Sequence, residues 1–205
     1  MRTVTCRCEE LIEAAFPEEI DLDNEINTGL LIEILEGNFF AVDCPKCGER
    51  IKPEFAVRLR SKKRSLDLLV LPEIERLAFY LDKIRAPKGG EILIGYAELY
   101  ERALIISEGL DAEAIEIIKY WLASRASEEA PKGSEIAITY AGKNEEDRLK
   151  FQIHGLRKNE IAIIPVRMDY YEKTRSDLSR TRRKEPFDKI LAGPYKSIRA
   201  LEADD

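Results

Sequence analysis

Four cysteines in two close pairs constrain this 205-residue chain more than any other feature of its sequence. One residue separates Cys6 from Cys8, and after residues 9–43 two residues separate Cys44 from Cys47. Tetrahedral coordination by thiolates at about 2.3 Å is well served by two such pairs, each presented by its own turn. The spacing therefore predicts one structural zinc ion on all four cysteines, with no open position for catalysis.

The second pair carries the stronger local signal. In the segment 44–48, Pro45 fixes φ as the chain enters the turn, and Gly48 relieves crowding so that backbone amides can point toward the thiolates. Lys46 lies between the two thiolates and offsets their charge. The first pair is one residue tighter, and Glu9 stands where glycine is favoured. Residues i and i+2 of an extended chain face the same way, so we expect a more strained first pair that still reaches the metal.

Other uses of the four thiols stay open at this point. Four thiolates also suit iron in a rubredoxin-like site, and a thiol switch or buried free cysteines are further alternatives. Cys6 precedes any segment long enough for an apolar signal core, so we expect no secretory signal and a cytoplasmic location. Reduced cysteines in that compartment favour metal over disulfides. No apolar run approaches 18 residues, so we expect no membrane span.

The charge balance disfavours general nucleic-acid binding. The net charge is −6 with a pI near 5.2, whereas neutralising phosphates requires a basic face. Two segments are locally basic: 173–184, with Asp177 as its one acid, and 58–64, which has no acid. The second of these is our candidate partner-binding segment, and its basic residues are Arg58, Arg60, Lys62, Lys63 and Arg64.

Apolar spacing in the N-terminal third predicts a compact unit, residues 1–71, with the cysteines near both ends. The expected elements are a strand, a helix ended by Gly37, a short β-prone run and two strands joined by the basic turn 61–64. In chain order these elements cover residues 11–16, 24–38, 39–42, 51–59 and 66–71.

The remaining residues, 72–205, predict helices followed by a small sheet. Asp111 is a good N-cap for a helix whose apolar face includes Trp121, and with the preceding helix it forms a helical hairpin. We therefore expect an α+β protein with an N-terminal zinc-ribbon-like β unit, a central helical hairpin, and a C-terminal small β-sheet with a charged helical tail and an irregular or partly disordered end. The expected ranges are helices at 73–85, 97–108 and from 111, strands at 136–140, 149–154 and 161–166, and a tail at 169–184.

One short internal repeat and one histidine complete the analysis of individual residues. Residues 86–97 and 130–141 match at nine of twelve positions, which we interpret as two Pro-Gly turns that each lead into an extended segment; a duplicated unit is the alternative. His154 is the one histidine, and we expect it at the end of a strand. Neither a nucleophile elbow nor a phosphate-binding loop is present, so we expect no catalytic activity.

The chain resembles the CpXC family, a bacterial and archaeal group named for its cysteine pairs. The resemblance covers residues 1–125 and implies a zinc-ribbon-like domain of unassigned function, with no established catalytic residues. The first pair departs from the family's Cys-Pro-x-Cys pattern, because here it is Cys-x-Cys. The matching segments are VTCRC at 4–8, LEG at 35–37, FAVDCPKCG at 40–48, LLVLP at 68–72, GYAEL at 95–99, and residues 109–120.

Three functional hypotheses follow. The leading one is a non-catalytic, zinc-stabilised binding or scaffold module that acts on another macromolecule, first of all a protein. The second is a redox-responsive zinc chaperone or sensor, because the cysteine spacing is similar to the zinc switch of redox-regulated heat-shock chaperones. The third is a nucleic-acid-binding module that uses the 58–64 turn.

Overall fold

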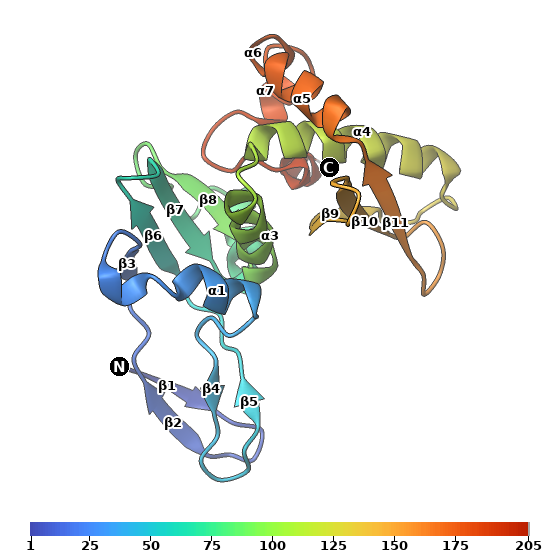
Figure 1. Ribbon diagram of the computed structural model, residues 1–205. Coiled ribbons are helices and arrows are strands. Elements are labelled where there is room, and N and C mark those ends of the chain that lie inside the picture. Colours follow the sequence, from blue (N-terminus) through green and yellow to red (C-terminus); the bar gives the residue numbers. More distant parts are fainter. Residues whose placement is uncertain (205) are drawn as a thin grey trace. The chain divides into compact units, whose positions relative to one another are not determined.

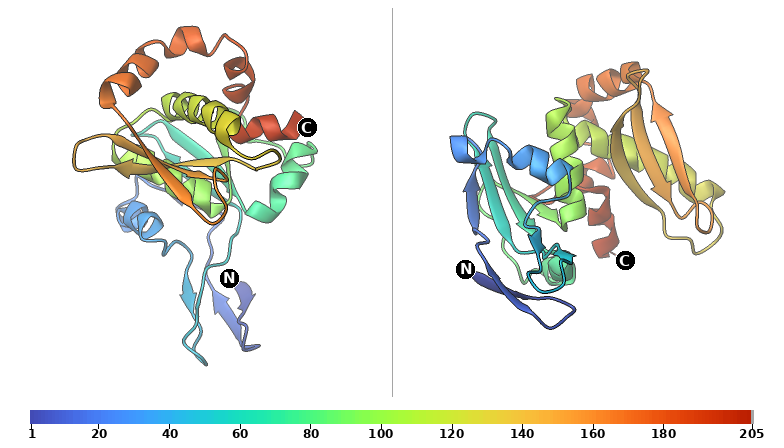
Figure 2. Two further views of the ribbon diagram at one scale, coloured as in Figure 1. Left: turned by 90° about the vertical axis from the view of Figure 1, so that its right-hand side faces the viewer. Right: turned by 60° about the horizontal axis from the view of Figure 1, so that its bottom comes forward.

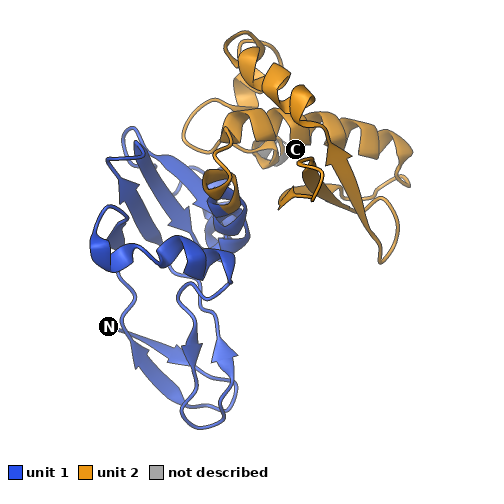
Figure 3. Cartoon of the chain, in the orientation of Figure 1, with its two compact units in different colours: residues 1–103 blue, residues 104–205 orange. Residues whose placement is uncertain are grey.

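The chain folds into two compact units (Figure 3). The computed structural model describes the backbone of residues 1–204 and the side chains of residues 1–201. Unit 1 comprises Met1–Ala103, and unit 2 begins at Leu104. This division differs from the expected boundary after residue 71, because strands on either side of that boundary pair within one sheet. In the described part of the chain, no helix has the length and apolar character needed to cross a bilayer.

A four-stranded sheet forms the body of unit 1 (Figure 1). Its order is β3 (Glu19–Asp21), β6 (Val57–Ser61), β7 (Leu66–Leu71) and β8 (Glu91–Ile94). β6 and β7 are an antiparallel hairpin, and each pairs in parallel with its outer neighbour. Alternate residues of these strands face α1 (Leu30–Leu35) and α3 (Tyr96–Ser107). The resulting core contains Ile20, Leu30, Ile34, Phe39, Val57, Leu59, Leu68, Val70, Leu93, Leu99 and Ala103.

Two small hairpins extend together from one end of this sheet (Figures 1 and 2). The first pairs β1 (Arg2–Thr5) with β2 (Leu11–Ala14), and the second pairs β4 (Val42–Asp43) with β5 (Arg50–Ile51). The strand expected at 11–16 is therefore confirmed in β2. Each hairpin carries one cysteine pair in its turn, so the hairpins place the two pairs at the same end of unit 1.

The β-prone run predicted at 39–42 is a strand only at its end. Phe39 and Phe40 lie in a turn, and Phe40 has a φ of 54°. Their rings stack 4.2 Å apart and contact Phe16 and Tyr96, so the chain turns inward before β4 begins. Packing of these aromatic rings overrides the local preference for an extended backbone. The helix predicted at 24–38 is present as a 3-10 turn, Glu25–Asn27, followed by α1.

The helix predicted at 73–85 is shorter than expected. A 3-10 turn at Glu73–Glu75 leads into α2 (Arg76–Tyr80). Asp82 has a φ of 54°, and the backbone N–H of Lys83 donates to the carbonyl of Ala78 at 3.0 Å. The left-handed conformation of Asp82 and the hydrogen bond from Lys83 back to Ala78 form a Schellman-type C-terminal cap. This cap satisfies carbonyl groups that have no hydrogen-bond partner within the helix.

Unit 2 is built on α4 (Ala112–Glu129), which packs against a three-stranded antiparallel sheet. Asp111 caps this helix as predicted, because its side chain accepts from the backbone N–H of Ala114 at 3.1 Å. The predicted strands are confirmed as β9 (Ala137–Lys143), β10 (Leu149–His154) and β11 (Ile161–Val166), in the order β11-β10-β9. The two predicted central helices are α3 and α4, and the division between the units falls within α3.

Short helices wrap the end of the chain around α4 (Figure 2). They are α5 (Met168–Ser176), α6 (Leu178–Thr181), α7 (Phe187–Ile190) and a 3-10 segment at Ile198–Asp204. Phe187 and Ile190 are buried against Ile117 of α4. The expected wrap is therefore present. Trp121, which the sequence places on the apolar face of this helix, is 48% exposed, and its ring centre lies 5.7 Å from that of Phe187.

The internal repeat marks two copies of one turn. The backbone N–H of Gly90 donates to the carbonyl of Pro87 at 3.1 Å, and that of Ser134 donates to the carbonyl of Pro131 at 3.0 Å. The first turn leads into β8 and the second into β9, as the turn interpretation predicts. His154 is the last residue of β10 and is exposed, which confirms its expected position at a strand end.

Candidate metal centre

The turn between β1 and β2 presents Cys6 and Cys8. The backbone N–H of Cys6 donates to the carbonyl of Glu10 at 2.9 Å, and the N–H of Glu9 donates to the carbonyl of Cys6 at 2.9 Å. Closing this tight turn forces Glu9 to a φ of 69°, in the left-handed region that favours glycine. Glu9 therefore stands at a position that favours glycine, as the sequence indicates.

The turn between β4 and β5 repeats this geometry with a glycine. The N–H of Cys44 donates to the carbonyl of Glu49 at 2.8 Å, and the N–H of Gly48 donates to the carbonyl of Cys44 at 2.9 Å. Gly48 has a φ of 74°, and a Cβ placed on it would meet no atom within 4 Å. Glu9 and Gly48 therefore occupy equivalent positions in the two turns, and only the second turn has the residue that the backbone prefers.

The two turns bring the four sulfur atoms into one group. All four Sγ atoms lie within 4.8 Å of one another, and the pairs Cys6–Cys47 and Cys8–Cys44 are each 3.6 Å apart. A tetrahedron with metal–sulfur bonds of about 2.3 Å has sulfur–sulfur edges of about 3.8 Å. No two of these cysteines are bonded to each other. The four residues therefore fit a tetrahedral metal ion in both number and spacing.

The pKa values of two of the four thiols, Cys44 and Cys6, shift in opposite directions. The backbone amides of Cys47 and Lys46 outweigh the effect of burial and lower the pKa of Cys44 to about 7. The backbone amide of Cys8 lowers the pKa of Cys6, but burial and the neighbouring thiols outweigh it and raise that pKa to about 12. The crowded thiols therefore oppose full deprotonation among themselves. A metal ion removes this opposition because it replaces the protons with positive charge.

Charged side chains next to the cysteines join the two turns. Arg7 of the first turn lies 3.7 Å from the carboxylate of Glu49 in the second, and Lys46 of the second lies 3.7 Å from Glu10 of the first. The Lys46 ammonium also donates to the carbonyl of Cys8 at 3.5 Å. Of these four charged residues, sequence reasoning identified Lys46 alone. The signal for the other three is that each turn carries a cation and at least one anion beside its cysteines.

The hairpins that carry the cysteines bury few apolar side chains. Val4 is buried in the first hairpin, whereas Leu11 is 65% exposed and the second hairpin has no buried apolar residue other than Cys44. Of residues 1–19 and 41–56, Val4, Cys6, Phe16 and Cys44 are buried, but none of them belongs to the apolar cluster around the four-stranded sheet. A metal ion held by the four thiols would therefore add to the stability of this end of the unit.

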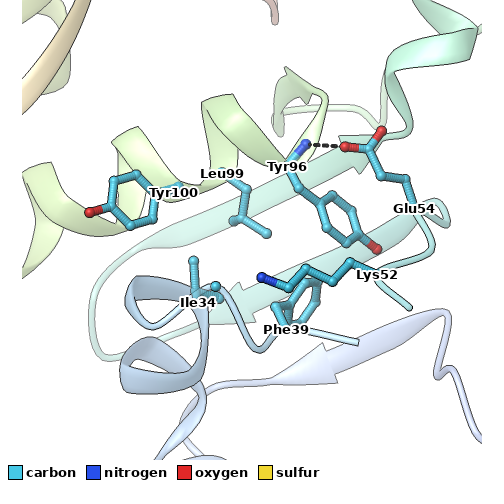
Figure 4. Close-up of a pocket in the computed structure, with 8 residues that line it drawn as sticks. Ile34, Phe39, Lys52, Glu54, Tyr96, Leu99 and Tyr100 are labelled. Carbon is cyan, nitrogen blue, oxygen red and sulfur yellow. Dashed lines mark hydrogen bonds between the residues drawn. The ribbon is translucent and has the colours of Figure 1, made fainter. Parts of the chain in front are cut away.

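A small cavity lies beside the base of the second hairpin (Figure 4). Its volume is about 250 Å³, and Lys52 extends its ammonium across the apolar side chains of Ile34 and Phe39. Glu54 is already engaged, since it accepts from the backbone N–H groups of Tyr96 at 2.9 Å and of Glu73 at 2.7 Å. The cavity is smaller than the range of about 300–1,000 Å³ typical of ligand sites. The carboxylate of Glu54, the acidic residue in its lining, is therefore bound to backbone N–H groups.

The basic segment 58–64 forms the hairpin expected from the sequence, but its five cations divide into two groups. Arg58 pairs with Asp67 at 2.7 Å, and Arg60 pairs with Glu19 at 2.9 Å. The side chains of the other three, Lys62, Lys63 and Arg64, are exposed, and no carboxylate of the described residues lies within salt-bridge distance of them.

Asp23 fixes the turn that carries these three free cations. Its carboxylate accepts from Ser61 Oγ at 2.7 Å and from the backbone N–H groups of Lys62 and Lys63 at 2.7 and 3.0 Å. These hydrogen bonds, first that from Ser61, lower the pKa of Asp23. The structure therefore presents a rigid turn with three unpaired cations at its tip.

Comparison with known proteins agrees with the cysteine arrangement. The chain is 26% identical over 226 residues to an uncharacterized protein of Treponema pallidum (strain Nichols), and the match covers all of both chains. No solved structure matches the chain. Residues 4–119, which include all four cysteines, match the family described as CpXC protein. This match spans more than half of the chain, and the chain therefore belongs to the CpXC family.

Proposed function

We propose that this chain is a non-catalytic binding module whose N-terminal end is stabilised by one structural zinc ion. One observation carries the proposal: four thiols at tetrahedral spacing join two hairpins that lack a core of their own. Four protein ligands fill the coordination sphere of zinc, so no position is left for a substrate or an activated water. The metal therefore serves the fold rather than a reaction.

The magnitude of zinc binding supports a structural role. Structural zinc sites of this kind contribute about 10–16 kcal/mol at neutral pH, compared with a net stability of about 5–15 kcal/mol for a whole domain. The four-stranded sheet has its own apolar core, whereas the hairpins do not. We therefore expect metal removal to unfold the hairpins while the sheet stays folded.

Elemental analysis of purified protein and of four single Cys→Ser variants tests the metal site. We expect one zinc per chain, lost in each variant together with the structure of the hairpins. Leu11→Ala is the matched control, because Leu11 lies in the same hairpin and is exposed. Iron in place of zinc would change the identity of the cofactor. Metal that depends on Cys44 and Cys47 alone would contradict the four-cysteine site.

The partner in this proposal is an acidic protein that contacts the tip of the β6–β7 hairpin. The support is the rigid turn with three unpaired cations on a chain that is acidic overall. Binding of fluorescent poly-glutamate should weaken in the triple variant Lys62→Gln, Lys63→Gln and Arg64→Gln. The control removes three exposed cations from the other basic segment, at Arg180, Arg183 and Lys184. Tighter binding to RNA or DNA than to poly-glutamate would favour the nucleic-acid alternative.

A second candidate function is redox sensing. The observation that favours it is the exposure of Cys47 and partial exposure of Cys8, which lets an oxidant reach two of the four thiols. Under this hypothesis, peroxide releases zinc, and the oxidised protein prevents aggregation of an unfolded client. Zinc retained under peroxide, with no such activity, would end this alternative.

A further inference from the structure

An ammonium group without an anion lies over the apolar cavity at the base of the second hairpin. The side chain of Lys52 crosses Ile34 and Phe39 (Figure 4). Its Nζ lies 3.4 Å from the position that a Cβ of Gly37 would take. Within the described residues, this nitrogen makes no hydrogen bond and has no carboxylate within salt-bridge distance. Lys52 is exposed, so an anion from solution can reach the ammonium beside its apolar walls.

The end of α1 does not need this cation as a cap. A lysine beside the C-terminal end of a helix often bonds the open carbonyl groups there. In α1 the backbone does so itself. The N–H of Gly37 donates to the carbonyl of Ile34 at 3.0 Å, and the N–H of Asn38 donates to the carbonyl of Glu33 at 2.7 Å. The Lys52 ammonium therefore stays available to a ligand.

The carboxylate in the lining does not balance Lys52. Glu54 accepts from the N–H of Tyr96, the first residue of α3, and from the N–H of Glu73. The start of a helix carries partial positive charge, which offsets a carboxylate placed there. Lys52 and Glu54 are the charged residues of the lining, so the ammonium is the charge that still lacks a partner.

The volume of the cavity, about 250 Å³, limits the size of its occupant. An apolar cavity of about 150 Å³ is enough to bind benzene, whereas drug-sized ligands use about 300–1,000 Å³. Phe39 and Leu99 supply buried apolar walls, and Tyr100 lies at the edge with its hydroxyl directed away from the other lining residues (Figure 4). The cavity therefore suits one six-membered ring with a short substituent.

We propose that this cavity binds a small monocarboxylate with one apolar ring, whose carboxylate pairs with the Lys52 ammonium. The ring packs against Ile34, Phe39 and Leu99. The ammonium selects an anion over a neutral or cationic ligand, and the apolar walls select a ring over a compact hydrated anion. The site uses neither the four thiols nor the β6–β7 turn, so this binding function goes beyond the one proposed above.

Nuclear magnetic resonance titration of the isotope-labelled, zinc-loaded chain with benzoate measures the binding. We expect the amide signals of Gly37, Leu99 and Tyr100 to shift with one dissociation constant of about 0.1–1 mM, as suits a small ligand with one charged contact. Benzyl alcohol has the same ring without the charge and should bind at least tenfold more weakly. Equal binding of the two compounds would overturn the proposal, as would the absence of shifts at about 20 mM benzoate.

Lys52→Met tests the role of the ammonium, because it keeps the length of the side chain and removes the charge. We expect the dissociation constant of benzoate to rise at least tenfold, while that of benzyl alcohol stays within twofold of the wild type. Lys88→Met is the matched control, since Lys88 is an exposed lysine of the same unit, and its benzoate affinity should match the wild type. Circular dichroism checks that both variants are folded.

Two results with these variants would overturn the proposal. One is benzoate binding that is equal in Lys52→Met and the wild type. The other is benzoate-induced shifts confined to residues 62–64, which would show general attraction of anions to exposed cations rather than binding in the cavity.

Discussion

Glu9 occupies a backbone conformation that glycine adopts more easily, and replacing it tests the geometry of the first metal-binding turn. Its φ of 69° matches the 74° of Gly48 in the second turn. The Glu9 side chain is exposed and makes no hydrogen bond or ion pair with the described residues, so its removal breaks no contact. We predict that Glu9→Gly strengthens metal binding, and that the reciprocal change Gly48→Ala weakens it.

The change in zinc affinity expected for Glu9→Gly follows from two opposing contributions to the free energy of folding. A left-handed conformation costs a non-glycine residue about 1–2 kcal/mol, which Glu9→Gly recovers. Glycine in turn loses about 0.5–1 kcal/mol more conformational freedom on folding. The net gain is about 0.5–1 kcal/mol. Because hairpin folding and metal binding are coupled, this gain corresponds to about a two- to fivefold lower dissociation constant for zinc. Gly48→Ala meets no steric obstacle, so it should lose a similar amount through strain alone.

Competition with a chromophoric zinc chelator measures these changes directly. Glu9→Gln is the control, because it removes the negative charge but keeps the backbone strain. We expect Glu9→Gly to bind zinc more tightly than Glu9→Gln, which separates the backbone effect from the charge effect. Equal affinity of the two variants, or tighter binding by Gly48→Ala than by the wild type, would refute the proposed equivalence of the two turns.

Three further predictions concern ion pairs of unit 1 and packing within unit 2. Arg76→Leu should destabilise unit 1 by about 3–5 kcal/mol in urea titrations, because it leaves two glutamates near a buried position without their cation; a loss below about 1 kcal/mol would contradict this. Phe187→Ala should destabilise unit 2 by about 3–5 kcal/mol and shift the emission of Trp121, whose ring it contacts; unchanged emission would show that the C-terminal wrap is not packed there. The hydrogen bond from Arg58 lowers the pKa of Asp67 below its usual 3.8. The Arg58–Asp67 pair therefore stabilises the folded state at neutral pH, and this stabilisation is lost as the pH falls through the pKa of Asp67 in the folded protein. The melting-temperature difference between wild type and Asp67→Asn should therefore disappear in acid, and a difference independent of pH would rule out the charge as its origin.

Features that depend on a few neighbouring residues could be predicted from the sequence. The cysteine spacing identified all four members of the thiol group, because each pair needs only one local turn to present its sulfurs. The strain at Glu9 and the cap at Asp111 were predictable for the same reason, since each depends on the dihedral angles and hydrogen bonds of adjacent residues. The strands of the small C-terminal sheet followed from alternating apolar residues bounded by turns.

The tertiary structure decided which surfaces meet. The pairing of Arg7 with Glu49 and of Lys46 with Glu10 depends on two hairpins from distant parts of the chain lying side by side. Pairing of β7 with β8 likewise carried unit 1 past the boundary expected after residue 71.

The same reason accounts for the orientation of α2. Ile74, Leu77 and Leu81 have helical spacing in the sequence, but this spacing does not say whether their side chains point inward. The partners of Arg76 decide this, because Glu98 and the Ile94 carbonyl lie about 20 residues farther along the chain and draw the guanidinium into the interior. Local patterns thus set the elements and their faces, whereas contacts between distant residues set which face is buried.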